Sequence, residues 1–109
     1  MPGSCDIPLG NVSNIFLLQV PLTPAAVNTI TAPEQTFTVP GLQPGDMVWV
    51  NKPTAQAGLG VAGQRVVSAN TLGITYVNPT VGNITPTAET YSILVIRPEN
   101  PGPQPSAIV

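Results

Sequence analysis

The chain has 109 residues, with 14 prolines, 10 glycines, and only three basic and five acidic side chains, so we expect one small domain. It has no histidine and one cysteine, which excludes a histidine general base, an imidazole metal ligand, a thiolate zinc site and an internal disulfide. The three basic residues are spread along the chain and do not supply the clustered positive charge that nucleic-acid binding requires.

Frequent prolines and glycines leave little room for helices, and short runs rich in β-branched and aromatic residues lie between them. This pattern predicts an all-β protein with a single antiparallel β-sandwich, for which we expect a jelly-roll arrangement. We expect an extended N-terminal arm at residues 1–13, the sandwich domain at 14–98 and a Pro-rich C-terminal arm at 99–109. The predicted strands are 14–20, 27–31, 35–39, 47–51, 65–69, 72–77 and 91–97.

Alternation within these strands predicts which faces are buried. Phe37 and its neighbours at 35 and 39 share one face, while the threonines at 36 and 38 lie on the other, so this strand has one wet side. The strands at 14–20 and 91–97 are instead apolar on both faces. Such a strand is central in its sheet, covered by a loop or docked on another chain, and these interpretations remain open.

Two connections carry information. The sequence GLQPGD at 41–46 predicts a hairpin between strands 35–39 and 47–51, because Pro44 fixes φ, Gly45 can adopt positive φ, and the Asp46 carboxylate can bond nearby amides. Residues 52–64 hold three glycines and little β pattern. A connection of this length is either a functional loop or a crossover between the two sheets.

The aromatic and acidic residues are the remaining candidates for a binding or catalytic site. Trp49, Tyr76 and Tyr91 lie in alternating apolar faces, which predicts core positions; the alternative is a stacking platform for a sugar. The five acidic residues fall in turns, strand ends or tails, so no paired catalytic carboxylates are indicated. Glu89 is a candidate to pair with Lys52 or Arg97 at a sheet edge. We therefore expect a protein that is not an enzyme and has no cofactor, metal or small-molecule substrate.

The low charge predicts a surface for a partner. Charged residues make up 7% of the chain, against about 25% in ordinary soluble domains, and the mean hydropathy is +0.25. The longest apolar run, residues 15–22, is too short to span a membrane, and residues 1–6 lack a signal-peptide pattern, so we expect synthesis in a cytoplasm. The predicted interface residues are Ile15, Leu17, Leu94, Ile96, Pro101, Pro103, Pro105, Ile108 and Val109.

Three stretches of the middle of the chain are similar to a known family. These are TFTVPGLQPGDMVWVNKPT, AGLGVAGQRVVSANTLGITYVNPT and ITPTAETYSILVIRP. Over roughly residues 35–98 they resemble the small decoration proteins, also called cement or head-stabilising proteins, of tailed bacteriophages. The specific pieces are Gly45 with Asp46 before an apolar strand, Gly58 with Leu59, residues 68–80, and Pro86 before Tyr91. They are turn and core signatures.

The resemblance implies a jelly-roll β-sandwich that sits on the outside of a phage capsid and clamps neighbouring major capsid protein subunits. We expect a homodimer or homotrimer, made in the bacterial host cytoplasm and located on the virion exterior, with no nucleic-acid or membrane partner. The alternative function is a carbohydrate- or receptor-binding β-module of a phage tail or fibre, in which Trp49 or Tyr76 stacks on the ligand.

Overall fold

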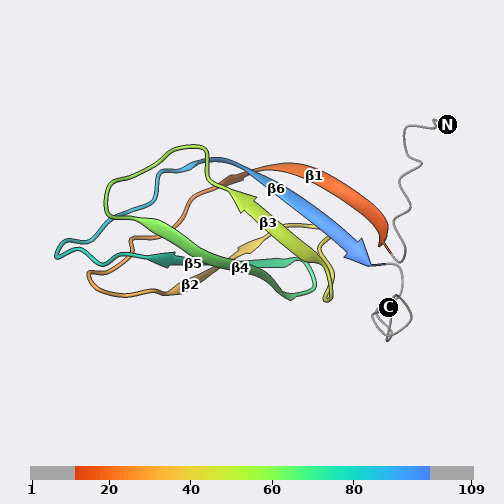
Figure 1. Ribbon diagram of the computed structural model, residues 1–109, viewed down its shortest axis with the longest axis horizontal. Helices are drawn as coiled ribbons and strands as arrows, with labels where there is room; N and C mark the ends of the chain where they lie inside the picture. The colour runs from red at the N-terminus through yellow and green to blue at the C-terminus, as the bar shows by residue number, and fades with distance from the viewer. Residues whose placement is uncertain (1–11, 99–109) are drawn as a thin grey trace, which may run out of the picture.

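The computed structural model describes residues 12–98. Six strands follow one another along the chain: β1 (Val12–Leu22), β2 (Glu34–Thr38), β3 (Met47–Asn51), β4 (Gly60–Ser68), β5 (Thr71–Val77) and β6 (Glu89–Pro98). They form two three-stranded antiparallel sheets, which we call the first sheet, in the order β1-β6-β3, and the second sheet, in the order β2-β5-β4. The sheets lie one over the other (Figure 1). The predicted all-β antiparallel sandwich is confirmed.

The core lies between the central strands of the two sheets. Leu72, Ile74 and Tyr76 point inward from β5, and Tyr91, Ile93 and Val95 point inward from β6; all six are 0–1% exposed. On each strand the three inward side chains occupy every second position, as the two-residue period of a strand predicts. Complete burial of one such aliphatic side chain contributes roughly 1.5–3 kcal/mol to folding, so these two strands hold the sheets together.

The chain changes sheet at every connection between the six strands except the β4–β5 hairpin. The predicted hairpin at residues 41–46 is therefore wrong, because β2 belongs to the second sheet and β3 to the first. Residues 52–59 also cross between sheets, which confirms the crossover interpretation of that connection. Strand β4 begins at Gly60, five residues before the predicted start, since two irregularities in its pairing with β5 obscure the alternation of its side chains.

The predicted strand at residues 27–31 is also wrong. This segment makes only two isolated bridges, Val27 with Ile84 and Thr31 with Asn78. Asn78 is fully buried and its side-chain amide donates hydrogen bonds to the carbonyls of Val27 (3.0 Å) and Gly82 (2.9 Å). A buried amide with these partners holds the 78–84 loop against the 27–31 segment. Hydrogen bonds from the Asn78 side chain thus take the place of the backbone hydrogen bonds that a regular strand pair would make.

Candidate interaction surface

The outer face of the first sheet carries two rows of apolar side chains. In the first row, Ile15 of β1 and Met47 of β3 flank Ile96 of β6. In the second row, the register places Leu17 and Trp49 on either side of Leu94. Side chains that are directly opposite on one face of a sheet are in contact distance. We call this six-residue surface the apolar face: Ile15, Leu17, Met47, Trp49, Leu94 and Ile96.

The apolar face is open to solvent within the described residues. The exposed fractions are 53% for Ile15, 66% for Leu17, 63% for Met47 and 67% for Trp49, while the two residues on central strand β6 are half-buried by their neighbours. Six adjacent side chains of this size form a patch of several hundred Å², roughly the largest that a monomeric protein leaves exposed. A patch of this extent is typical of a surface that binds a partner.

The border of the apolar face is polar but uncharged. Gln19, Ser92 and Asn51 form the next row of the sheet, and the Ser92 hydroxyl donates to Oε1 of Gln19 at 3.1 Å. At the other end of β1 the Ser13 hydroxyl donates to the Arg97 carbonyl at 3.2 Å. A partner that covers this face would meet hydrogen-bonding groups at the rim without having to desolvate a formal charge.

The outer face of the second sheet has a different character. It carries threonines on β2 and β5 and an ion pair in which Arg65 Nε and one terminal nitrogen donate to the two carboxylate oxygens of Glu34 at 2.8 and 2.9 Å. The pair spans Gly73 on the central strand, where a larger residue would meet the Glu34 carboxylate. The hydrogen bond from Arg65 holds the pKa of Glu34 below its ordinary value. The molecule therefore has one apolar and one polar outer face.

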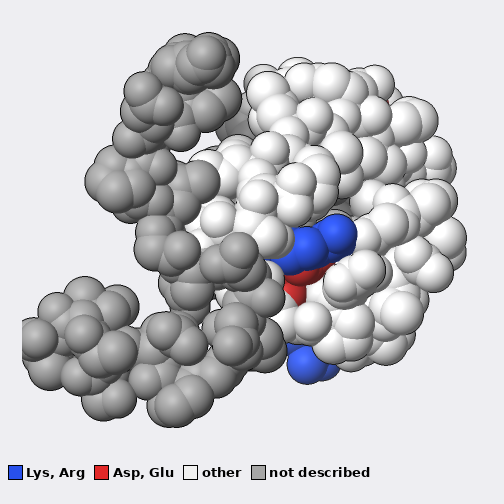
Figure 2. Space-filling view, turned by 90° about the vertical axis from the view of Figure 1, so that its right-hand side faces the viewer, with Lys and Arg blue, Asp and Glu red and all other residues white. Residues whose placement is uncertain are grey.

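A second ion pair fixes the 41–46 connection. Arg97 on β6 donates to both carboxylate oxygens of Asp46 at 2.9 and 2.8 Å, and to the Gly41 carbonyl at 2.7 Å. The bond from Arg97 holds the pKa of Asp46 below its ordinary value, although the burial of the carboxylate opposes this. The guanidinium also lies 5.1 Å from the centre of the Phe16 ring. On the face drawn in Figure 2, one group of basic atoms lies directly against acidic atoms and a second basic group lies below it.

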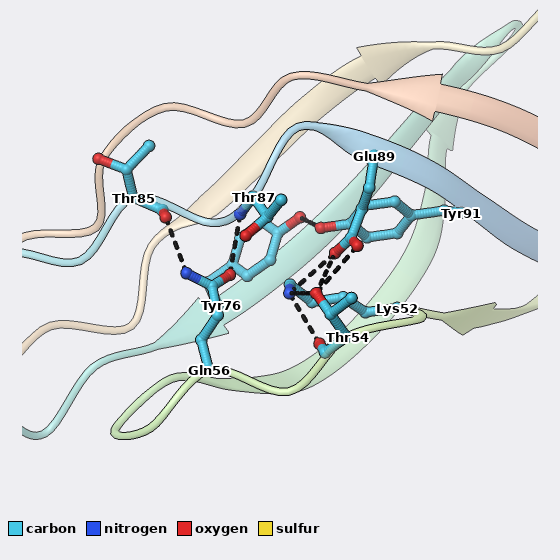
Figure 3. A network of polar contacts seen from close by, with 8 residues as sticks. All are labelled: Lys52, Thr54, Gln56, Tyr76, Thr85, Thr87, Glu89 and Tyr91. Atoms are coloured by element: carbon cyan, nitrogen blue, oxygen red, sulfur yellow. Dashed lines mark hydrogen bonds and ion pairs between the residues drawn. The ribbon is translucent and has the colours of Figure 1, made fainter.

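A third ion pair belongs to a network that closes the 52–59 crossover (Figure 3). Lys52 Nζ lies 2.9 Å from Glu89 Oε2, and both side chains are about one-tenth exposed. The Lys52 ammonium also donates to the carbonyl and hydroxyl oxygens of Thr54, so its three donors are all used. Burial would raise the pKa of Glu89, but the hydrogen bonds from Lys52 and Thr54 and the lysine charge outweigh it and lower that pKa. The Lys52 ammonium and the Glu89 carboxylate are both paired, so the network holds the start of the 52–59 crossover against the start of β6.

The charged side chains of residues 12–98 balance one another. Residues 12–98 contain three basic and three acidic side chains, and each of the six is in an ion pair. Long-range attraction or repulsion between copies, or with a charged partner, is correspondingly weak. Within the same residues no group of three or more potential metal ligands occurs, and no helix is long and apolar enough to cross a membrane.

One apolar depression lies beside the 39–42 connection, between that connection and β1. It holds about 250 Å³ and is lined by Phe16, Leu18, Pro40, Gly41, Leu42, Val95 and Arg97. The charge of Arg97, its one ionised group, already faces Asp46. What remains is an apolar hollow between β1 and the connection, without a free polar group to orient a ligand.

The structure brings together four of the residues that the sequence indicates for an interface. Ile15, Leu17, Leu94 and Ile96 all lie on the apolar face. The other five, Pro101, Pro103, Pro105, Ile108 and Val109, lie outside the described residues. The core positions predicted for Tyr76 and Tyr91 are confirmed.

The core position predicted for Trp49 is wrong, and Met47 beside it was missed as a surface residue. Val48 is 9% exposed and Val50 is half-buried, so it is this pair that faces the core. The alternation of β3 allows either face to point inward. The two valines, which favour buried strand positions, were the one sequence feature that pointed to the Val48 and Val50 face as the buried one.

Comparisons of the chain with protein-family models, with curated proteins and with solved structures found no match.

Proposed function

We propose that this chain is a structural virion protein, a decoration protein that binds the outside of a tailed-phage capsid and stabilises contacts between major capsid protein subunits. The observation that carries the proposal is the apolar face, six adjacent apolar side chains on one outer face of the sandwich. The resemblance of residues 35–98 to such proteins supports the same role. The jelly-roll assignment and the homo-oligomeric state are part of this proposal.

The physical properties of the surface suit attachment to a protein lattice. Apolar side chains and a neutral rim gain free energy on burial without the cost of desolvating charges. A standard interface buries about 800 Å² on each partner, so the apolar face would form the centre of such an interface and its polar border the rim. Trp49 is the largest exposed side chain of the face, and tryptophan is enriched among the residues that dominate binding energy.

Co-sedimentation with undecorated heads tests the proposal. Purified protein at micromolar concentration is mixed with heads that lack decoration, and the bound fraction is measured after pelleting. We expect saturable binding, weakened at least about tenfold by Trp49→Ala, because a buried tryptophan at an interface is typically a hot spot. Thr36→Ala, on the exposed outer face of the second sheet, is the matched control and should bind as the unmodified chain does.

Two results would contradict this proposal, the first its function and the second the apolar face as the binding site. One is the absence of saturable co-sedimentation at any micromolar concentration. The other is equal binding by Trp49→Ala and the control, which would place the contact elsewhere. Circular dichroism of each variant separates lost binding from lost folding.

A second candidate function has one specific observation in its favour. Trp49 is 67% exposed, and Asn51 and Ser92 lie beside it at the polar rim, as in a surface that stacks and hydrogen-bonds a sugar. Tyr76 is fully buried and is unavailable for this role. Since Trp49 is the chain's single tryptophan, its fluorescence reports directly on binding. A saturable response to bacterial surface saccharides, with no binding to heads, would favour the carbohydrate- or receptor-binding function.

A further inference from the structure

Each sheet of the sandwich has two edge strands, and three of these four edges are protected against pairing with another strand. Strand β2 is five residues long, follows Pro33 and begins with the ion-paired Glu34. Strand β3 is also five residues long and lies between the ion-paired Asp46 and Lys52. Strand β4 has two register irregularities and carries Arg65. Short length, charge, proline and bulges are the usual means of preventing edge-to-edge association.

Strand β1 lacks these protections over most of its length. It has 11 residues, none of them charged, and it pairs regularly with β6 from Asn14 to Leu22. Proline occurs in it only at Pro21, near its end. Among residues 12–98, β6 is its one strand neighbour, so the backbone groups on the other side of β1 have no strand partner there. A long, uncharged edge with regular pairing is a template for another strand.

We propose that β1 pairs antiparallel with β1 of a second copy of this chain, joining the two first sheets into one continuous sheet of six strands. The sequence of β1 suits pairing with itself. A two-fold axis at Phe16 places Ile15 opposite the partner's Leu17, so on the outer face apolar side chains meet apolar ones. On the other face the same register places Asn14 opposite the partner's Leu18. Because β1 has no charge, symmetry creates no like-charge pair.

This arrangement has a consequence for the outer surface. A two-fold axis perpendicular to a sheet keeps the same face of both copies on the same side. The two apolar faces then merge along β1 into one surface of twice the area. The inference concerns the free protein and does not depend on what that surface binds; if it binds a lattice, two linked faces hold more firmly than one.

The oligomeric state of the full chain in solution, under reducing conditions that keep Cys5 as a thiol, tests the proposal. Sedimentation velocity should give about twice the 11.2 kDa chain mass in the micromolar range. The double variant Ile15→Lys/Leu17→Lys should sediment as a monomer, because each new lysine lies opposite a lysine of the partner strand. Both positions are more than half exposed, so the fold should survive, which circular dichroism checks.

The matched control is Met47→Lys/Trp49→Lys, which puts the same charge on the same face at the far edge of the sheet. It should remain dimeric. If both double variants become monomers, the copies associate through the apolar face and not through the β1 edge, which overturns the proposal. A monomeric unmodified chain, or a dimer that both variants leave intact, overturns it as well.

Cross-linking tests the register separately. Ile15→Cys and Leu17→Cys are made as single variants, each with Cys5→Ser. Three samples are oxidised in a glutathione disulfide buffer: each variant by itself, and an equal mixture of the two. Directly opposite Cβ atoms in an antiparallel pair are about 4.5–5.5 Å apart, close enough for a disulfide after a small shift. A covalent dimer should form much faster in the mixture than in either variant alone. Equal rates in all three samples would overturn the proposed register.

Discussion

The hydroxyl groups of Tyr76 and Tyr91 lie 2.8 Å apart in the middle of the core and bond to each other. Both residues are fully buried, and one hydroxyl donates to the other, so neither oxygen lacks a hydrogen-bond partner. Burial raises the pKa of both phenols, and the neighbouring Glu89 charge acts in the same direction. The alternation of β5 and β6 predicts that both tyrosines are buried. It does not predict the bond, which depends on how the two sheets are placed over each other.

This pair predicts a loss of stability at alkaline pH. A tyrosine with a raised folded-state pKa contributes stability that is fully present below its unfolded pKa of about 10 and is lost as the pH rises toward the folded value. The free energy of unfolding in urea should therefore fall progressively above about pH 10. Because the chain has two tyrosines, tyrosinate absorbance reports on this pair alone. Ionisation of both at their ordinary pKa in the folded protein would contradict the prediction.

The corresponding substitutions separate the bond from the burial. Tyr91→Phe leaves the Tyr76 hydroxyl buried without its partner and should lower the free energy of unfolding by about 1–3 kcal/mol. The double variant Tyr76→Phe/Tyr91→Phe removes both polar groups and should cost less than the single change. A double variant that is destabilised by the sum of the two single effects would argue against a mutual bond.

At the scale of elements, the connections were harder to predict than the strands. Residues 41–46 have the expected local turn features: Gly45 has φ of 96°, and the Gln43 amide donates to the Asp46 carboxylate at 2.9 Å. The same features suit a hairpin and a crossing equally. The partners that hold the crossing are distant in sequence: Asn70, at the β4–β5 turn of the second sheet, bonds the backbone of Val39 and Leu42, and Arg97 on β6 of the first sheet bonds Gly41 and Asp46. Single-sequence turn chemistry contains no information about such a partner.

Gly58 in the 52–59 crossover yields a prediction at this scale. It has φ of 80°, and a Cβ atom there would meet the side chains of Thr80 and Ile84. Gly58→Ala should therefore lower the free energy of unfolding by about 1–3 kcal/mol, from backbone strain and crowding together. Gly82→Ala is the matched control, because nothing lies within 4 Å of its added methyl group; it should change stability by less than about 0.5 kcal/mol. Urea denaturation of both variants gives the comparison, and equal effects would show that the packing around Gly58 adjusts freely.

For the whole molecule, the sequence predicted part of the apolar face. Ile15, Leu17, Leu94 and Ile96 follow from strands that are apolar on both sides, and the structure places them together. It could not predict the third strand of that face, because both faces of β3 are apolar. Whether Trp49 or Val48 points inward is decided by which sheet β3 joins and by what lies beneath it. Periodicity defines the faces of a strand and leaves the neighbours undetermined.

The ion pairs of the whole domain predict its response to acid. The carboxylates of Glu34, Asp46 and Glu89 all have pKa values lowered by their basic partners. A lowered folded-state pKa contributes stability that is present above the unfolded pKa, about 4 for these groups, and is lost as the pH falls through the folded value. With no histidine in the chain, the free energy of unfolding should be nearly constant from about pH 5 to pH 8 and should decrease below about pH 4.

Thermal unfolding across this range measures the effect, and a double variant locates it. Asp46→Asn/Arg97→Met removes one ion pair without leaving a lone charge, so the decrease in stability with falling pH should become shallower. An unchanged acid slope would mean that this pair does not contribute to it. The six side chains of the apolar face carry no titratable group, so association through it should stay constant for as long as the domain is folded. Acid should thus weaken the fold before it weakens the contact, and a loss of binding at a pH where the domain is still folded would contradict the proposed face.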